Sequence, residues 1–299
     1  MAVELTTPTR EQTRARYPDE SGHVERDGVR IYYEVYGSGE PTLLLLPTWA
    51  LFHSRHWKMQ IPYFARHCRV LTFDPRGNGR SDRPQRPEAH DEREYAADAL
   101  AVMDATQTER AIIVGFSMGG QRGLILAAEH PGRVAGAIFI GPSYVGGGEP
   151  VAERAAADFD REYETHEGWA KHNRHYWLSD YADWLEFFVR RMFAEPHSTK
   201  PIEDGLAWGL ETDAETLIAT YDAPSLTPED ARALASRVRC PVLVIHGAND
   251  GHSSLSRGAA LAEHTGGALV VLEGSAHAPH VRHPVKVNLL LRDFVRRHA

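Results

Sequence analysis

The chain has 299 residues, of which 42% are hydrophobic, so it is long and apolar enough to fold around its own core without disulfide bonds. Its formal net charge is −8 and it has no block of lysine or arginine, which argues against nucleic acid and anionic membranes as partners. No apolar run near its start has the length of a signal peptide, and none later approaches a membrane span. We therefore expect a soluble cytoplasmic protein, and the sign of the charge says little about a small-molecule substrate.

The N-terminal third is predicted to begin with a mobile arm, residues 1–21, which carries many charges and no apolar stretch. Two short strands follow in residues 22–36, joined at Asp27-Gly28, a dipeptide that accepts the positive φ angles of a tight hairpin turn. Residues 42–46 predict a strand buried on both faces, and residues 54–66 predict a helix.

The middle of the chain alternates strands with helices. A strand over residues 69–73 ends in a glycine-rich turn, Asp74 to Asp82, that is too polar for the core. A helix over residues 92–106 leads into an apolar strand over 111–114, and a further strand covers residues 134–140. This alternation predicts an α/β fold, a mostly parallel twisted sheet with helices on both faces.

The stretch on which the function depends is Gly115-Phe-Ser-Met-Gly119. It joins the apolar strand to an apolar-periodic helix that ends before Pro131. A Gly-x-Ser-x-Gly sequence in that setting is the nucleophile elbow, in which a strained turn lifts the serine hydroxyl above the sheet. Ser117 is therefore a candidate nucleophile, and Phe116 beside it is a candidate substrate contact.

The alternation stops over residues 145–236. This stretch holds 12 of the chain's 27 aromatic residues, which is too many for a plain surface insertion. We predict a helical cap, whose aromatic side chains form its own small core, except for some that line a substrate pocket. Trp177 and Trp184 are the candidate substrate contacts among them.

The sheet pattern resumes with strands over residues 241–245 and 268–272, and a helix over 284–297 ends the chain. A nucleophilic serine needs a histidine as general base and a carboxylate that orients the histidine. Asp250 and His277 each lie a few residues past one of these strands, where loops of a parallel sheet meet.

The chain resembles the α/β-hydrolase superfamily over roughly residues 22–144 and 237–299. Four motifs carry the resemblance, in the expected order: Asp74-Pro-Arg-Gly-Asn-Gly-Arg-Ser81, Gly115-Phe-Ser-Met-Gly-Gly120, Gly247-Ala-Asn-Asp250 and Gly274-Ser-Ala-His277. The resemblance implies that Ser117 is the nucleophile, His277 the base and Asp250 the acid, that residues 145–236 form the cap, and that the enzyme needs neither a metal nor an organic cofactor. A serine at the elbow separates the chain from dehalogenase-like and epoxide-hydrolase-like relatives, which carry aspartate there.

One departure from the family pattern concerns the oxyanion hole. Where the family usually has His-Gly after the strand over residues 42–46, this chain has Pro47-Thr48. The resemblance implies that the amides of Trp49 and Met118 bind the oxyanion, with Ala50 as an alternative to Trp49. The Thr48 hydroxyl either points at the oxyanion or only packs.

Other residues with chemical potential have plainer interpretations. His277, His280 and His283 are spaced at three, as are His172 and His175, but no cysteine or carboxylate shares the short spacing, so we expect no metal site. His53 and His56 lie near the oxyanion strand, where they could touch substrate. Cys68 and Cys240 each precede an apolar strand and are expected to be buried thiols.

The sequence thus predicts a cofactor-free serine hydrolase that cleaves an apolar or aromatic ester, lactone or thioester through an acyl-enzyme on Ser117. Two alternatives stay open, because fold and triad do not fix the reaction. The same triad could transfer the acyl group to another acceptor or cleave a carbon–carbon bond. A ligand-binding protein on a hydrolase fold is the second alternative.

Overall fold

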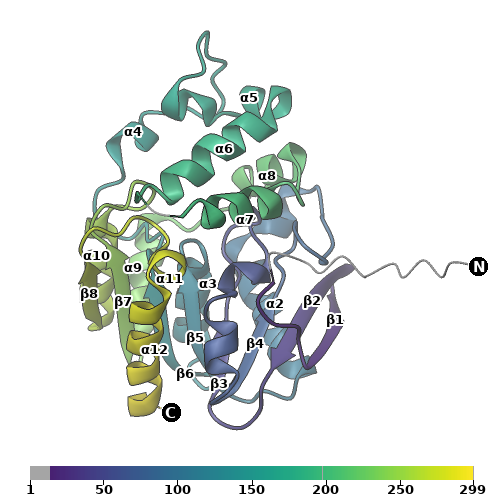
Figure 1. The fold of residues 1–299 in the computed structure, drawn as a ribbon, viewed down its shortest axis with the longest axis vertical. Coiled ribbons are helices and arrows are strands. Elements are labelled where there is room, and N and C mark those ends of the chain that lie inside the picture. Colours follow the sequence, from purple (N-terminus) through teal and green to yellow (C-terminus); the bar gives the residue numbers. More distant parts are fainter. Residues whose placement is uncertain (1–13, 197, 299) are drawn as a thin grey trace, which may run out of the picture.

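One eight-stranded sheet runs through the molecule, which we describe from a computed structural model covering residues 14–196 and 198–298 (Figure 1). The strand order is β1-β2-β4-β3-β5-β6-β7-β8. The strands are β1 (Glu20–Arg26), β2 (Val29–Tyr36), β3 (Thr42–Leu45), β4 (Arg69–Phe73), β5 (Ala111–Phe116), β6 (Val134–Ile140), β7 (Val242–Gly247) and β8 (Ala268–Leu272). Only the β1–β2 and β2–β4 pairs are antiparallel, which confirms the predicted mostly parallel sheet.

The N-terminal hairpin turns where the sequence predicts, with Asp27 at φ +53° and Gly28 at φ +76°. The β1 strand begins two residues earlier than expected, at Glu20. Arg14 forms a buried ion pair of 2.8 Å with Glu34, so the last residues of the predicted arm are attached to the sheet. The prediction for residues 1–13 lies outside the described residues.

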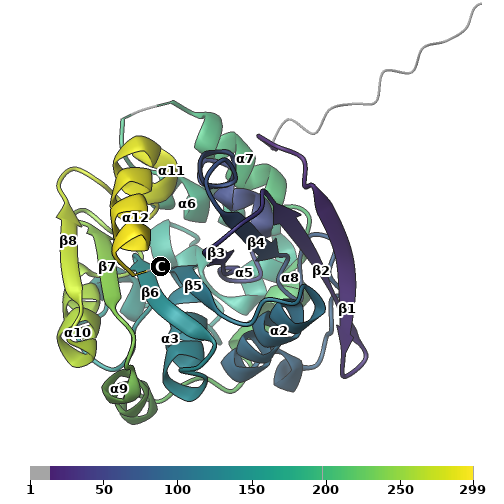
Figure 2. The same cartoon turned by 90° about the horizontal axis from the view of Figure 1, so that it is seen from below.

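Helices cover both faces of the sheet, as predicted, and they pack through two separate apolar layers (Figure 2). One face carries α2 (Glu92–Ala105), α3 (Gly119–Glu129), α9 (Pro228–Arg237) and α10 (Leu255–Thr265). The other face carries α1 (Ile61–Phe64) and α12 (Pro284–His298), with the short α11 (Pro279–Arg282) leading into α12. Strands β3 and β5 are buried at every position because both faces are covered.

The predicted helix over residues 54–66 is wrong as a single element. A 3₁₀ turn over Ser54–Trp57 and the one-turn helix α1 replace it. Proline at position 62 has no amide hydrogen, and its ring would clash with the carbonyl four residues earlier, so a continuous helix cannot pass through it. The proline stands instead in the first turn of α1, where no amide donor is needed.

The inserted stretch forms a layer of helices over the edge of the sheet at which β3, β5, β6 and β7 end (Figure 1). Its helices are α4 (Ala152–Ala155), α5 (Arg174–Ser179), α6 (Tyr181–Met192), α7 (Lys200–Gly209) and α8 (Ala214–Tyr221). Helix α9 also lies within the predicted cap, but Ala231, Leu234 and Ala235 pack into the core layer beneath α3. The structural boundary between cap and core therefore precedes α9.

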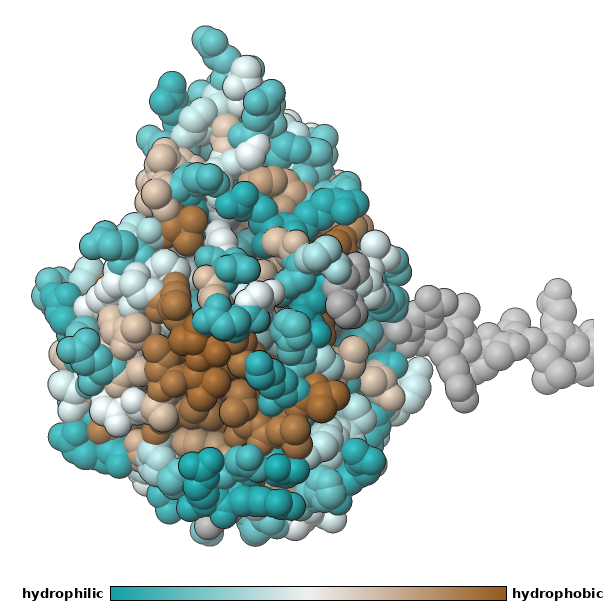
Figure 3. Space-filling model, turned by 60° about the vertical axis from the view of Figure 1, so that its left-hand side comes forward, coloured by the Kyte–Doolittle hydropathy of each residue, from teal (hydrophilic) through white to brown (hydrophobic). Residues whose placement is uncertain are grey.

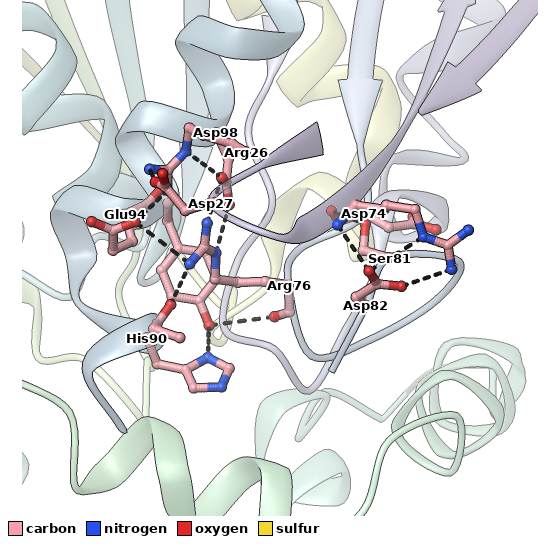
Figure 4. Close-up of polar contacts among 12 residues, drawn as sticks. Arg26, Asp27, Asp74, Arg76, Ser81, Asp82, His90, Glu94 and Asp98 are labelled. Carbon is pink, nitrogen blue, oxygen red and sulfur yellow. Dashed lines mark hydrogen bonds and ion pairs between the residues drawn. The ribbon is translucent and has the colours of Figure 1, made fainter. Parts of the chain in front are cut away.

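The glycine-rich turn after β4 is held by buried charges (Figure 4). Arg76 donates two hydrogen bonds to Asp98 of α2, at 2.6 and 2.7 Å, and Arg26 of β1 donates a third at 3.0 Å. In the middle of the turn, the Asn78 side chain donates to the Leu51 carbonyl at 2.8 Å and to the carbonyl of Trp208 in α7 at 3.2 Å. The turn thus connects the first strands, α2 and the cap.

Polar and apolar side chains are unevenly distributed on one face of the molecule (Figure 3). Figure 3 shows apolar side chains gathered over one part of a face of the molecule. Val285 and Leu289 of α12 are among the exposed large hydrophobic residues, at 73% and 39% exposure. No helix in residues 14–196 or 198–298 is both long and apolar enough to cross a membrane. Cys68 is buried, Cys240 is half-buried, and both are free thiols.

Candidate active site

The turn between β5 and α3 holds Ser117 in a strained conformation. Its φ angle is +52°, in the left-handed region that a non-glycine residue rarely adopts. Gly115 and Gly119 make the tight turn possible, because a Cβ on Gly115 would collide with the Gly119 carbonyl and a Cβ on Gly119 would lie 2.8 Å from the Pro47 carbonyl oxygen. The Ser117 amide donates to the Ile140 carbonyl of β6 at 2.9 Å, which fixes the turn to the sheet.

Ser117, His277 and Asp250 are brought together by three loops at the carboxyl ends of strands β5, β7 and β8. The distance from Ser117 Oγ to His277 Nε2 is 3.1 Å, and the distance from His277 Nδ1 to Asp250 Oδ2 is 2.7 Å. A carboxylate can only accept, so Nδ1 carries the proton and Nε2 is free to accept the serine proton. This is the arrangement that a nucleophilic serine requires.

Asp250 is held as a charged acceptor. Its Oδ1 accepts the amides of His252 and Ser253 at 2.8 and 2.9 Å, and its Oδ2 lies 3.2 Å from His246 Nε2. Burial alone would raise the pKa of Asp250, but the charge of His277 and the contact with His246 outweigh it, so the pKa lies well below its ordinary value. The carboxylate is therefore ionised at neutral pH and can stabilise an imidazolium on His277.

Trp49 and Met118, the expected oxyanion donors, line a small cavity of about 30 Å³ that also contains Ser117 and Thr48. In the part of the chain that the structure describes, neither amide donates a hydrogen bond to another protein group. Both amides are thus available to an oxyanion at the elbow.

Arg122 of α3 fixes the loop that carries Trp49. Its Nη1 donates to the carbonyls of Pro47, at 3.2 Å, and of Thr48, while its Nε donates to Glu92 at 2.9 Å. In a trans peptide the carbonyl and the following amide point in opposite directions. Because Arg122 holds the Thr48 carbonyl, the amide hydrogen of Trp49 points away from the Arg122 side chain.

Apolar side chains form about half of the lining of the small cavity, and polar groups including Arg154 and His252 form the rest. Phe116 lines the cavity, as the sequence predicts for a substrate contact, together with Leu51, Phe52, and Phe188 and Met192 of the cap. Trp177 and Trp184 line neither this cavity nor the larger one described below. They are fully buried in the cap, with their ring centroids 4.2 Å apart and packed behind Trp49 at 5.8 and 6.0 Å.

The remaining histidines lie outside the triad. His280 Nε2 is 3.4 Å from His56 Nδ1, and both rings are buried beneath the cavity floor against Trp57. His53 contacts Arg55 and Glu211 instead of either cavity. In residues 14–196 and 198–298 no group of three His, Cys, Asp or Glu side chains is placed to hold a metal ion.

Two further site residues were not foreseen from the sequence. The His252 ring is stacked on His277, with centroids 5.0 Å apart and planes 17° apart, and it lines the cavity. Burial, and then the charge of His277, lower its pKa well below the ordinary value, so the ring is neutral. Ser143 Oγ lies 3.3 Å from Ser117 Oγ. The rule that loops after parallel strands converge could have indicated both, since they follow β7 and β6.

A larger cavity of about 460 Å³ adjoins the small one. The two share Trp49, Met118, Ser143, Arg154 and His252 as lining residues, so they meet beside the nucleophile. The larger cavity extends between the cap and the core, where α4, α8 and α10 contribute side chains. A substrate bound at Ser117 thus has room for a sizeable group on one side.

Comparison with known proteins supports the assignment of this chain to the α/β hydrolases. The family model for the alpha/beta hydrolase fold matches residues 41–284. The chain is 28% identical over 270 residues to 3-oxoadipate enol-lactonase 2 of Acinetobacter baylyi, covering 90% of this chain and 94% of that one. It is 26% identical over 284 residues to the serine hydrolase BPHL of Mus musculus, covering 92% and 86% of the two chains.

Solved structures show the same fold. Est816, described as an N-acyl homoserine lactone degrading enzyme, matches with a TM-score of 0.75 and 26% identity over 91% of this chain and all of that chain. The esterase RhEst1 from Rhodococcus sp. matches with a TM-score of 0.77 and 24% identity, covering 93% and 98% of the two chains. The chain therefore belongs to the α/β-hydrolase fold family and is a hydrolase, as its four motifs predict.

Proposed function

We propose that this protein is a serine hydrolase that cleaves an ester, lactone or thioester with an apolar or aromatic acyl part through an acyl-enzyme on Ser117. The observation that carries the proposal is the continuous hydrogen-bonded chain from Ser117 Oγ through His277 to Asp250. The Ser117 end of this hydrogen-bonded chain lies in a cavity that has two available amides, at Trp49 and Met118.

The reaction follows from these groups. His277 Nε2 takes the proton of Ser117 while Oγ attacks the substrate carbonyl carbon, and the amides of Trp49 and Met118 bind the resulting oxyanion. The intermediate collapses to the acyl-enzyme as His277 gives its proton to the leaving oxygen or sulfur. Water then attacks the acyl carbonyl, with His277 as base, and releases the acid and free Ser117. Asp250 keeps the imidazole oriented throughout and stabilises its positive charge.

The substrate class is supported by the cavity and by the relatives. Apolar side chains form about half of the lining of the small cavity beside Ser117, which favours an apolar group next to the scissile carbonyl. One relative is named an enol-lactonase, and matched structures are described as an esterase and as a lactone-degrading enzyme. The two free thiols, Cys68 and Cys240, would remain reduced in the cytoplasm, which we propose as the site of action.

Hydrolysis in ¹⁸O-labelled water tests the proposed reaction. We would screen p-nitrophenyl esters of rising chain length beside bulky aromatic esters, and analyse the acid product by mass spectrometry. Incorporation of solvent oxygen into the acid shows that the acyl–oxygen bond is cleaved and that water is the final acyl acceptor. Acyl transfer to an added alcohol or amine in place of water would identify the first alternative, and cleavage of an added β-diketone, with no ester hydrolysed, would identify carbon–carbon bond cleavage. Ser117→Ala should lose on the order of 10⁴-fold or more in kcat.

A further inference from the structure

Two arginines from different layers of the molecule line the larger cavity. Arg154 comes from α4 of the cap and Arg257 from α10 of the core, and these helices lie one above the other at the β8 side of the molecule (Figure 1). Arg154 also lines the small cavity that contains Ser117. A positive charge is therefore present where the two cavities meet, and a second one lies farther along the larger cavity.

Neither guanidinium has a carboxylate partner among the described residues. Arg154 donates to the carbonyl of His252 at 3.1 Å and lies over the Trp169 ring, with its central carbon 5.5 Å from the ring centroid. The Nε of Arg257 is buried without a hydrogen-bond partner. Burial, and then the charge of Arg154, lower the pKa of Arg257, so the two cations lie close enough to repel each other.

Arg154 and Arg257 are half-buried, whereas the fully buried arginines in the described part of the chain each have a carboxylate partner. Arg76 pairs with Asp98 at 2.6 Å, and Arg122 pairs with Glu92 at 2.9 Å. Glu92 is the acidic side chain that lines the larger cavity, and its charge is already matched by Arg122. The cavity thus keeps two uncompensated positive charges in partly desolvated positions, which an anion would stabilise.

We infer that Arg154 and Arg257 bind an ionised carboxyl group of the substrate, so that the enzyme acts on esters or lactones that carry a second, free carboxylate. This inference rests on the proposed hydrolysis at Ser117. A carboxylate presents two oxygens that a guanidinium binds through paired N–H donors. The apolar part of the substrate next to the scissile bond occupies the small cavity, and the charged arm extends past Arg154 into the larger one.

The test uses matched substrates of equal chain length. Mono-p-nitrophenyl adipate and suberate carry a terminal carboxylate, whereas p-nitrophenyl hexanoate and octanoate end in a methyl group. We expect the intact enzyme to have a higher kcat/KM on the charged member of each pair. In Arg154→Met and Arg257→Met this preference should fall by about 10-fold or more, mainly through a higher KM for the charged ester.

Arg191→Met is the matched control. Arg191 also lies 5.5 Å over the Trp169 ring, but it pairs with Glu153 at 3.0 Å and lines neither of the two cavities. Its loss should leave the charged-to-neutral preference as in the parent. An equal fall of the preference in Arg191→Met and Arg154→Met would overturn the inference, because a general loss of positive charge would then explain the effect.

Equilibrium binding separates the carboxylate site from the reaction. Calorimetry on Ser117→Ala, with mono-p-nitrophenyl adipate as the probe, should show binding that weakens about 10-fold or more when Arg154→Met is added. If the enzyme hydrolyses neutral and charged esters equally well and binds the probe equally well with and without Arg154, that result overturns the carboxylate site and leaves the proposed hydrolysis intact. If no ester is hydrolysed but binding depends on Arg154, the hydrolysis proposal fails and the site stands. Arg154→Gln, which also removes the charge but keeps a polar end, replaces Arg154→Met if the methionine variant does not fold.

Discussion

The Thr48 side chain is where the chain leaves its family's pattern, and its position favours a part in the chemistry. Thr48 is buried and lines the small cavity with Ser117. Its hydroxyl makes no hydrogen bond to another group within residues 14–196 and 198–298. A hydroxyl donor beside the amides of Trp49 and Met118 would bind an oxyanion more strongly than it binds the neutral carbonyl of the substrate.

Thr48→Val should therefore lower kcat by about 10-fold to 10³-fold with little change in KM, because valine keeps the shape and removes only the hydroxyl. Steady-state kinetics on one good ester decide the question. Parental kcat in the valine variant would mean that the threonine only fills space.

His90 is a buried neutral histidine whose hydrogen bonds define its tautomer. Its Nε2 lies 2.8 Å from the Pro84 carbonyl, which can only accept, so Nε2 carries the proton and Nδ1 accepts from the Tyr95 hydroxyl at 2.8 Å. Burial, more than the nearby arginines, lowers its pKa to about 4 (Figure 4). Below about pH 6.5 this histidine is protonated in the unfolded chain, whereas in the folded protein it stays neutral down to about pH 4. Lowering the pH between these values therefore decreases the free energy of unfolding.

The loss of unfolding free energy caused by His90→Gln should therefore be smaller at acidic pH than at neutral pH. Urea denaturation of the parent and the variant should give a difference in unfolding free energy that is about 2 kcal/mol smaller at pH 5 than at pH 7, following about 1.4 kcal/mol per pH unit. A difference that is the same at both pH values would show that His90 titrates alike in the folded and unfolded chains.

At the scale of elements, α3 supports two parts of the site at once. Its start forms the elbow of Ser117, and Arg122 in its first turns holds the loop after β3. Arg122→Lys keeps the charge but lacks the planar fork that reaches Glu92 and two carbonyls together. The Trp49 amide should then lose its fixed direction.

We expect Arg122→Lys to lower kcat by about 10-fold or more with little change in KM. Arg93→Lys is the control, because Arg93 also joins α2 to α3, through Glu129, but on the surface. Equal kinetics in the two lysine variants, with both proteins folded, would contradict the positioning role of Arg122.

The turn after β4 gives a prediction of stability. Asp98 is fully buried between Arg76 and Arg26, so Asp98→Asn removes the buried carboxylate of Arg76 and leaves it only a longer ion pair of 3.6 Å with the partly exposed Glu94. The Asp98→Asn substitution should reduce the free energy of unfolding by about 3 kcal/mol or more. Asp82→Asn is the control, because its partner Arg30 is 61% exposed and such surface pairs contribute about 1 kcal/mol or less. Comparable urea midpoints for the two variants would contradict this account.

The elements also show what the sequence could predict. Apolar runs located β4, β6 and β8 to the residue, because each run has a clear start and end in the sequence. The helical pattern over residues 54–66 was misleading because one proline breaks it. The helical cap predicted over residues 145–236 includes α9, but the sequence pattern could not show that α9 packs on α3, since a helical pattern gives an apolar face without identifying its neighbour.

The same limit applies to the site. Ser117, Asp250 and His277 could be chosen because backbone rules locate loops after strands. Trp177 and Trp184 could not be placed, because a large apolar ring fits equally well in a cap core and in a pocket wall, and here they lie in the core. The sequence did not indicate that Arg154 lines a cavity, since a charged residue in a polar stretch is typical of a solvated surface.

At the scale of the whole molecule, the cap and the sheet together make the site. Trp49 of the core contacts Trp177, Trp184 and Phe188 of the cap, and its Nε1 donates to Thr220 of α8 at 2.7 Å. The cavities lie along this junction, so side chains of the cap help to form the space that a substrate occupies beside Ser117. Every step of the proposed reaction nevertheless depends on Ser117 as the nucleophile.

Covalent trapping with a fluorophosphonate measures that dependence most directly. The account predicts that the intact protein gains the mass of one phosphonyl group, located on the peptide that contains Ser117, and that His277→Ala labels far more slowly because the serine is no longer deprotonated. Ser117→Ala should not label. No mass gain in the intact protein, or labelling that persists in Ser117→Ala at the parental rate, would contradict the account.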